Sequence, residues 1–315
     1  MQKQALLVGL NKYQLLGELR YARQDSEEFG EALRMYCGFS DQDITLMSCR
    51  SEGALLGDTH YIELALGRLV EHRDLDLLVF GFWGHGFSPE PGKRYLCGIN
   101  TIEEDLLRSA ISLDMVKAKL AQVQAENTLL ILDCCQNRPT GRSLGGESMT
   151  KGEETALASL ARDIQAVQRN KDWSRIPTVA VLTSCREGQK AYEWESRGHG
   201  IFTEFLLQAF KETEGSIGAI ASWMADRVAK TAAEIFHQNQ VPYLTFEGKG
   251  DFQLALKKPP LEQKKKLSLL TKDANEIPEQ LANHKHSSNL GSALLKAQIL
   301  RNQRLKKGIS LKYKK

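Results

Sequence analysis

Residues 128–135 read TLLILDCC, an apolar run that ends in an acid and two cysteines. A second run, residues 75–86, reads LDLLVFGFWGHG and ends in a histidine between glycines. Neither run alternates with polar residues, which is typical of parallel strands covered on both faces. Both runs are therefore predicted to be central strands of an α/β sheet. Because ligands of such sheets bind beyond the carboxyl ends of the strands, we expect His85 and Cys135 to share one rim.

A thiol beside an imidazole can perform covalent acyl transfer. The thiolate is the attacking species, and the imidazole accepts and later returns its proton. Each residue alone has a simpler interpretation: a cysteine at a strand end commonly acts as a small apolar residue, and a histidine between glycines is often only a loop residue. The occurrence of His85 and Cys135 on two neighbouring predicted strands favours catalysis.

The two motifs also resemble those of a known family. His85 precedes Cys135 by about 50 residues, a separation already known for caspases. The GHG of residues 84–86 and the DCC of residues 133–135 resemble the Gly-His-Gly and Asp-x-Cys motifs of caspase-like cysteine peptidases, and among these the metacaspases and bacterial orthocaspases most. The resemblance runs from about Gln4 to Leu256.

The resemblance implies an α/β caspase-like three-layer sandwich, a mostly parallel sheet of about six strands with helices on both faces. The residue patterns agree, since predicted strands and helices alternate. Ser112 is expected to cap a helix that leads to the strand at 128–132, and residues 88–94 are expected to form a surface loop. Apolar patterns predict further strands at 4–10, 43–48, 95–99 and 177–184, and helices at 22–36, 59–70, 154–167, 201–210 and 217–236.

The domain organisation follows from the same resemblance and from composition. Residues 1–256 are expected to form the peptidase domain. Within it we expect a large-subunit-like part (about 1–140), a connecting loop and helix (about 136–175) and a small-subunit-like part (about 176–256). Residues 257–315 are a basic extension that opens with KKPP, a sequence typical of linkers.

The resemblance also implies roles for individual residues. Cys135 is the expected nucleophile and Cys134 is expected to face the core. The backbone N–H groups of Gly86 and Cys135 are the expected oxyanion donors. Two further rim residues, Cys185 and His199, are expected to be structural or to line the substrate site.

Substrate choice is predicted from two acids. Asp25 and Asp133 match metacaspase positions that bind a basic side chain, and Leu19 stands where animal caspases carry an arginine that binds aspartate. Paired carboxylates suit a guanidinium, so cleavage after arginine, and less well after lysine, is expected. The simpler alternatives are a helix-dipole role for Asp25 and bonds to nearby amides for Asp133.

Charge is distributed unevenly along the 315 residues, whose formal net charge is +3. Residues 257–315 hold 15 Lys or Arg and 4 Asp or Glu, so the extension carries +11 and residues 1–256 carry −8. The extension is interpreted as a solvated tail, a helix that docks a protein partner, or an arm that binds a polyanion. The sequence does not choose among these, nor does it indicate an oligomeric state.

Cofactors and membrane segments are not indicated. The six cysteines show no metal-binding spacing, and Glu103, Glu104 and Asp105 form only a generic acidic cluster. We therefore expect no obligatory cofactor, calcium included. No apolar segment has the length of a membrane span, and the opening residues lack the pattern of a signal peptide, so a cytoplasmic protein without membrane contact is expected.

The predicted function is thus a cysteine endopeptidase that acts on proteins or peptides with a basic residue before the cleaved bond. Regulatory or stress- and defence-linked proteolysis is expected, with autoprocessing in the polar, basic stretch between Gln136 and Arg175. The alternative is a catalytically silent scaffold that binds partners through its rim and its basic tail.

Overall fold

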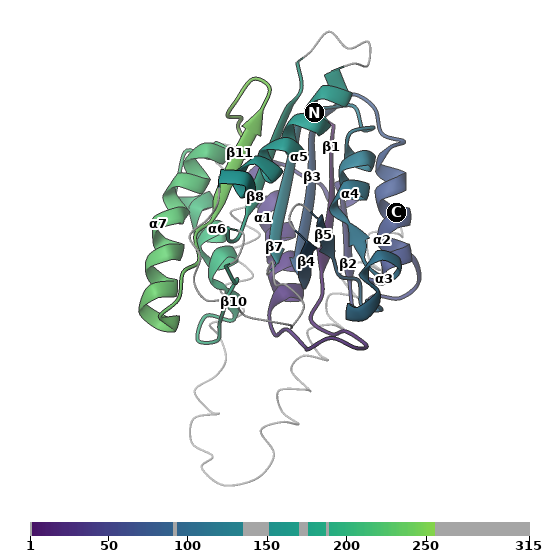
Figure 1. Cartoon of the computed structure of the whole chain (residues 1–315). Helices are drawn as coiled ribbons and strands as arrows, with labels where there is room; N and C mark the ends of the chain where they lie inside the picture. Colours follow the sequence, from purple (N-terminus) through teal and green to yellow (C-terminus); the bar gives the residue numbers. More distant parts are fainter. Residues whose placement is uncertain (1, 91–92, 135–150, 170–175, 187–188, 256–315) are drawn as a thin grey trace, which may run out of the picture. The chain divides into compact units, whose positions relative to one another are not determined.

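The computed structural model describes residues 2–90, 93–134, 151–169, 176–186 and 189–255, which are coloured in Figure 1. The helices are α1 (Ala22–Cys37), α2 (Thr59–Leu69), α3 (Leu106–Ser109), α4 (Leu113–Leu120), α5 (Lys151–Arg169), α6 (Ile201–Glu212) and α7 (Ile217–Phe236). The strands are β1 (Lys3–Gly9), β2 (Ile44–Ser48), β3 (Leu75–Gly84), β4 (Gly86–Glu90), β5 (Lys93–Leu96), β6 (Ile111–Ser112), β7 (Ala125–Cys134), β8 (Thr178–Thr183), β9 (Glu193–Trp194), β10 (His199–Gly200) and β11 (Tyr243–Glu247).

Six strands form the main sheet in the order β11-β8-β7-β3-β1-β2. All neighbours run parallel except β11, which is antiparallel to β8. The two runs predicted to be central strands are β3 and β7, and they pair directly. Their register sets Trp83 opposite Asp133 and Gly84 opposite Cys134. The carboxyl ends of both strands therefore meet at one rim, as the sequence predicted.

Both faces of the sheet are covered by helices, which explains why the central strands carry apolar residues at nearly every position. Along β3, Leu78, Phe80 and Phe82 belong to a core shared with α2, α4 and α5. Leu77, Val79 and Trp83 belong to a core shared with α1, α6 and α7. Burying each such side chain contributes about 1.5–3 kcal/mol to folding before entropy is counted.

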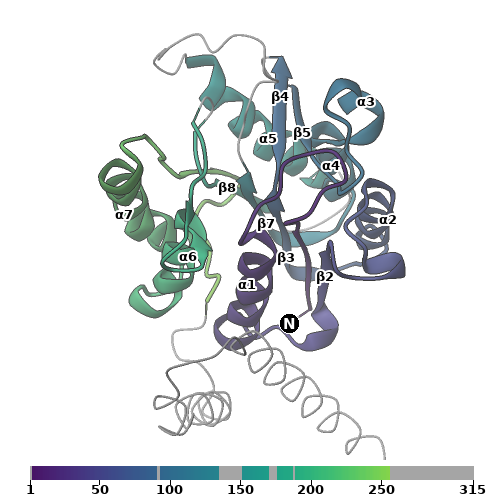
Figure 2. The same cartoon turned by 90° about the horizontal axis from the view of Figure 1, so that it is seen from below.

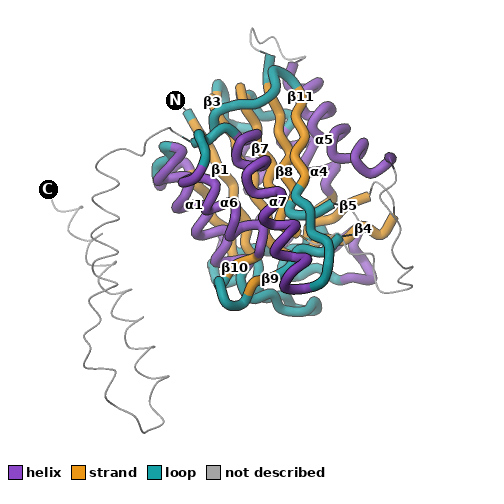
Figure 3. The backbone as a smooth tube through the Cα atoms, turned by 90° about the vertical axis from the view of Figure 1, so that its left-hand side faces the viewer, coloured by secondary structure: helices purple, strands orange, loops and turns teal. Residues whose placement is uncertain are grey.

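The views from other directions show these layers. Figure 2 shows α1, α6 and α7 on one side of the strands and α2, α4 and α5 on the other, and Figure 3 shows the first group lying across the sheet. The predicted α/β three-layer sandwich with a mostly parallel six-stranded sheet is therefore confirmed.

Local interactions of the backbone explain several helix ends, of which the cap at Ser112 was predicted. The hydroxyl of Ser112 accepts a hydrogen bond from the backbone N–H of Met115 at 3.1 Å, so it caps α4 as predicted. Ser216 caps α7 in the same way, through Ala219 at 3.2 Å. Helix α1 ends at Gly38, whose φ of 70° is the left-handed conformation that glycine adopts without strain.

Two expectations were wrong in detail. The stretch after His85 is not a loop: β4 begins at Gly86 and pairs with β5, which starts earlier than the strand predicted at 95–99. Pro89 suggested a loop, but β4 is the edge strand of its small sheet, and an edge strand tolerates a proline. Helix α5 begins at Lys151, three residues before the predicted start, because a glycine at 152 does not prevent a first turn that is followed by two glutamates.

Several predictions lie outside the described residues. These are the loop of residues 136–150, Cys135 itself, and the tail of residues 257–315, so the proposed domain limits stay predictions. Within the part of the chain that the structure describes, no helix is both long enough and apolar enough to cross a membrane.

Candidate active site

His85 follows the end of β3 and is held from two sides. Its Nε2 lies 2.7 Å from the carbonyl oxygen of Gly17, and its backbone N–H donates to the hydroxyl of Tyr13 at 2.8 Å. The rings of Tyr13 and His85 lie against each other, with their centroids 4.8 Å apart. Because a carbonyl oxygen can only accept, Nε2 must carry a proton, and in the neutral ring Nδ1 is then an acceptor.

The segment between β1 and α1, residues 10–21, supplies both contacts and is braced at its ends. The backbone carbonyl of Asn11 accepts from the N–H of Leu19 at 2.8 Å, and the side-chain amide of Asn11 donates to the carbonyl of Arg20 at 2.6 Å. In β9, the carboxylate of Glu193 accepts from the backbone N–H groups of Arg20 and the next residue, at 2.7 and 2.9 Å. Hydrogen bonds therefore hold this segment in place both within itself and to β9.

Cys134, the last residue of β7, is buried in the core that α2, α4 and α5 share. Its carbonyl oxygen lies 3.8 Å from the thiol sulfur of Cys185, which is also buried. Cys134 thus packs in this core but also borders the pocket described below, and the structural interpretation of Cys185 agrees with these contacts. Cys135 follows directly in the sequence but lies outside the described residues.

Asp133 lies on the other face of β7 from Cys134. Its Oδ2 accepts a hydrogen bond from the hydroxyl of Thr203, in the first turn of α6, at 2.9 Å. That hydroxyl in turn accepts from the indole N–H of Trp83 at 2.8 Å. Because the indole can only donate, it directs the hydroxyl proton of Thr203 toward the carboxylate. Among the described residues, Asp133 thus receives a hydrogen bond from a hydroxyl group of another element, and bonds to the amides that follow Cys134 lie outside the described residues.

Asp25 lies in the first turn of α1 and is only 2% exposed. Its Oδ1 lies 2.6 Å from Nδ1 of His199, and its Oδ2 accepts from the backbone N–H of Gly200 at 2.9 Å. Both partners belong to β10, so the carboxylate joins α1 to a strand far along the chain. These contacts go beyond the helix-dipole role that was the simpler alternative for Asp25.

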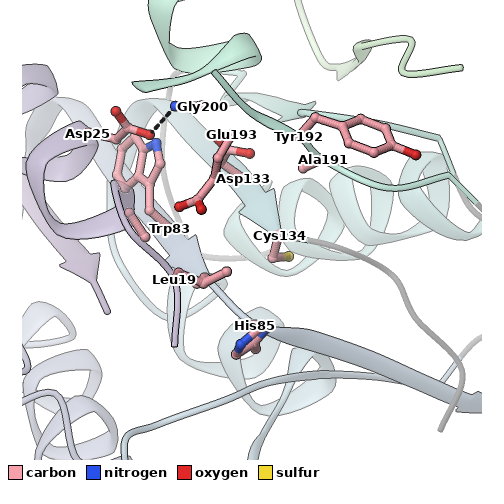
Figure 4. A pocket seen from close by; sticks show the side chains of 12 residues that line it. Leu19, Asp25, Trp83, His85, Asp133, Cys134, Ala191, Tyr192, Glu193 and Gly200 are labelled. Atoms are coloured by element: carbon pink, nitrogen blue, oxygen red, sulfur yellow. Dashed lines mark hydrogen bonds between the residues drawn. The ribbon is translucent and has the colours of Figure 1, made fainter. Parts of the chain in front are cut away.

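A single pocket is lined by three of the predicted site residues, His85, Asp25 and Asp133, whereas Gly86 is not among its lining residues. Figure 4 shows His85 at one end and Asp25, Asp133 and Glu193 at the other. A Cβ built on Gly200 would lie 3.2 Å from Oδ2 of Asp25 and 3.4 Å from Oδ2 of Asp133. The two carboxylate oxygens therefore both lie close to Gly200, where a larger residue would crowd them. One cationic group in the pocket beside Gly200 could therefore contact both acids.

The family model of the caspase domain, peptidase family C14, matches residues 2–253. The chain belongs to the caspase-domain family. This is a family of cysteine peptidases, and membership supports peptide-bond hydrolysis in general.

Solved structures agree on the fold of this caspase-domain chain. A protein from Geobacter sulfurreducens aligns with a TM-score of 0.53 at 17% identity, covering 80% of this chain and 95% of its own. Caspase-1 from Spodoptera frugiperda aligns with a TM-score of 0.50 at 16% identity, covering 78% of this chain and 86% of its own. No curated protein sequence matches the chain. At such identities the structural likeness concerns the fold alone.

Burial affects the two ends of the caspase-domain pocket differently. At one end it lowers the pKa of His85, which favours the neutral imidazole. At the other end burial, followed by the charge of Asp25, raises the pKa of Asp133 to about 7. Burial also raises the pKa of Asp25, although the hydrogen bond from His199 opposes this rise. The acidic end therefore holds carboxylates that gain stability when a cation enters.

Gly86, the predicted oxyanion donor in this caspase domain, starts β4. The N–H of Cys97 donates to the carbonyl of His85 at 3.0 Å, and Gly86 is paired with Leu96. In an antiparallel ladder these two facts make Gly86 and Leu96 a non-hydrogen-bonded pair. The N–H of Gly86 therefore points away from β5 and can donate a hydrogen bond to another acceptor.

Sequence reasoning missed three contributors to the site. Glu193 was not singled out as a pocket acid, Thr203 was not recognised as the donor to Asp133, and Tyr13 was not connected with His85. An aromatic residue or an acid in a polar loop gives no periodic signal. Only the spatial arrangement shows their contacts.

Metal binding has little support within the ranges that the structure describes. They contain no group of three or more His, Cys, Asp or Glu side chains placed to hold a metal ion. The cluster of Glu103, Glu104 and Asp105 forms a short 3-10 helix, and Asp105 pairs with Arg108 at 3.9 Å. Independence from calcium stays a prediction.

Proposed function

We propose that this caspase-domain protein is a cysteine endopeptidase that cleaves after arginine, and less readily after lysine, with Cys135 as nucleophile and His85 as base. The observation that carries the proposal is the pocket itself, in which Asp25 and Asp133 lie at one end and His85 at the other. A regulatory or stress- and defence-linked role would follow from such narrow specificity.

The chemistry follows from the proton positions on His85. Its Nε2–H is donated to Gly17, so Nδ1 takes the thiol proton of Cys135. The thiolate bonds to the scissile carbonyl carbon. As the C–N bond breaks, the imidazolium returns the proton to the leaving amine. Water then loses a proton to His85 and attacks the thioester, which releases the carboxylic acid and restores the thiol.

The negative oxygen formed in each step needs donors that are already oriented. The N–H of Gly86, directed away from β5, and the N–H of Cys135 are proposed for this role. Removing one such donor commonly costs roughly 3 kcal/mol of barrier, about a hundredfold in rate.

Specificity is assigned to the acidic end of the pocket. A guanidinium between Asp25 and Asp133 would donate charge-assisted hydrogen bonds to both carboxylates. An aspartate side chain in the same place would be repelled by their negative charge. Leu19, on the pocket wall, offers an apolar surface to the stem of an arginine. Lysine is expected to bind less well, because its compact ammonium cannot span two carboxylates as a planar fork does.

Matched fluorogenic peptides that end in Arg, Lys or Asp test this proposal. The wild type is expected to prefer Arg over Lys and to leave Asp uncleaved. Asp25→Asn and Asp133→Asn should each reduce Arg turnover, while the exposed Asp226→Asn on α7 should not. Preference for Asp, or unchanged Arg turnover in both pocket variants with folding intact, would refute arginine specificity.

A second assay separates an active peptidase from a silent scaffold. A thiol-reactive electrophile carried on an arginine peptide should label the wild type and leave Cys135→Ala unlabelled. Cys185→Ala provides a matched control, because this thiol is buried and should not be the site of labelling. Equal labelling of the wild type and Cys135→Ala would favour the scaffold.

Autoprocessing is proposed for the stretch between Gln136 and Arg175, where basic residues recur after the nucleophile. Purified wild type should develop new N-termini after Arg or Lys in this stretch, and Cys135→Ala should not. Fragments that form equally in both proteins would point to a contaminating protease instead.

A further inference from the structure

His199 contacts carboxylates with both of its ring nitrogens. Its Nδ1 lies 2.6 Å from Oδ1 of Asp25, and its Nε2 lies 3.4 Å from Oε2 of Glu28, one turn further along α1. His199 is 7% exposed, and Asp25 is 2% exposed. The ring therefore lies between two acids of one helix, directly behind the pocket.

This two-sided contact determines the charge of the ring. A neutral imidazole has one N–H and one acceptor nitrogen, so it can donate to only one of the two acids. Ionised carboxylates only accept, and both nitrogens must donate to satisfy them. The contacts therefore fit an imidazolium, and the hydrogen bond with Asp25, followed by that with Glu28, raises the pKa of His199 to about 10.

We propose that His199 is a positioning residue of the arginine pocket, which as an imidazolium holds the carboxylate of Asp25 in place and keeps it ionised. The inference rests on the proposed function, because it explains how Asp25, one of the two acids proposed to bind the guanidinium, stays ionised and correctly oriented. His199 itself does not line the pocket, so it acts through Asp25.

The positive charge of His199 is needed because the acids of the pocket repel one another. Asp25 is buried and, like Asp133, lies close to Gly200, and the charge of Glu193 also acts on it. Burial and like charge both favour protonation, and a protonated Asp25 would be a poor receptor for a cation. A fixed positive charge on the side of Asp25 away from the substrate counteracts both effects while leaving the pocket open.

The backbone contact shows why the position as well as the charge is held. Oδ2 of Asp25 accepts from the N–H of Gly200, next to His199 in β10, so the two donors reach the two oxygens from adjacent residues. The carboxylate cannot rotate without losing one of them. The charged groups that act on this arrangement are Asp25 and Glu28 of α1, Asp133 of β7, Glu193 of β9 and Lys211 of α6, which acts on Glu28.

The test measures binding of benzamidine, a simple amidinium probe, in a Cys135→Ala background, by calorimetry from about pH 5 to pH 9. His199→Asn is the main variant, because its amide can still donate to Asp25 but carries no charge. The affinity should fall on the acid side in both proteins, with the fall displaced upward by about one pH unit in His199→Asn. Because the pKa of Asp25 is about 6 in the wild type, this corresponds to about twofold weaker binding at pH 7 and roughly tenfold weaker binding near pH 5.

Two further variants frame this result. Glu28→Gln removes the outer acid only and leaves His199 paired with Asp25, so it should not displace the curve upward. His237→Asn makes the same exchange at an exposed position after α7, where the left-handed backbone accepts asparagine, and should change nothing. Circular dichroism checks that each variant is folded.

A second readout does not depend on ligand binding. In ¹⁵N-histidine-labelled protein, both ring nitrogens of His199, assigned by their loss in His199→Asn, should show the shifts of a protonated imidazole at pH 7 and above. A neutral ring at pH 7, or an unchanged pH dependence in His199→Asn with benzamidine still bound, would overturn the role of His199 alone. Absence of benzamidine binding at every pH, with the ring charged, would overturn the arginine pocket and with it this role.

Discussion

The two ends of the pocket respond to burial in opposite ways. At the proposed catalytic end, which holds His85 and is called the catalytic end below, burial favours the uncharged imidazole, which is also the form that can accept a proton. At the acidic end, burial disfavours the ionised Asp25 and Asp133, although the ionised form is the one that would bind a cation. Without substrate, burial thus stabilises the functional protonation state at the catalytic end and destabilises it at the acidic end. A bound guanidinium would remove part of that destabilisation.

The largest expected effect comes from the catalytic end. His85→Ala removes the only proposed base, so turnover of Arg peptides should fall roughly 10³- to 10⁴-fold. Binding of benzamidine should be unchanged, because the acids at the other end remain. Steady-state hydrolysis and calorimetry check the two halves of this prediction. If benzamidine binding is also lost, the two ends are not separable in the way that the pKa directions suggest.

Asp133→Asn should separate function from stability at the acidic end. Arg turnover should fall roughly 10- to 100-fold, since a charge-assisted hydrogen bond becomes a neutral one. The pKa of Asp133 is raised from 3.8 to about 7 in the folded protein, so the wild type loses stability as pH rises through that window. The variant lacks this loss and should melt at a higher temperature than the wild type at pH 8, with a smaller difference at pH 4.

Thermal melts of both proteins across pH, without ligand, measure this effect. Each kcal/mol should appear as about 2–4 °C in Tm for a domain of this size. The exposed Asp226→Asn is the matched control and should follow the wild type at every pH. A variant that melts lower than the wild type at pH 8 would mean that the ionised Asp133 stabilises the unliganded fold, contrary to the direction of its pKa shift.

A smaller effect is expected from Tyr13→Phe, which removes the hydroxyl that accepts from the N–H of His85. Loss of one such bond should lower kcat roughly 3- to 10-fold, with little change in KM. Tyr61→Phe, on α2 away from the pocket, is the matched control. An increase in KM alone would mean that Tyr13 acts on substrate binding at the acidic end. The two ends of the pocket would then not act separately.

The smallest effect is expected on removal of the tail by truncation at Lys258. Both ends of the pocket are built from residues before position 204, so Arg turnover and benzamidine binding should stay within about twofold of the wild type. An insoluble or inactive truncated protein would show that the tail belongs to the fold. If the tail binds a polyanion, the full chain should lose that affinity steeply with added salt.

The sequence predicted what depends on local pattern. Continuous apolar runs identified β3 and β7, a serine before an amphipathic stretch identified the cap of α4, and the motif resemblance selected Asp25 and Asp133. These signals lie within a few residues of the feature that they predict. The confirmed fold class follows from them, because covered parallel strands admit few architectures.

The contacts of the acidic end could not be predicted in the same way. His199 and Asp25 are 174 residues apart, and Glu193 and Arg20 are 173 apart. No local periodicity records such a pairing, and a histidine in a polar loop resembles a surface residue. The role now inferred for His199 depends on two distances that only the folded chain provides.

One short segment connects the two ends that were contrasted above. Residues 10–21 carry Gly17, whose carbonyl fixes the proton position on His85, and Leu19, which forms part of the pocket wall beside the acids. A change of wall residue made to admit another side chain would therefore also disturb the carbonyl two residues away. In evolution or in engineering, a new specificity at this site would require compensating changes along the same segment to preserve the rate.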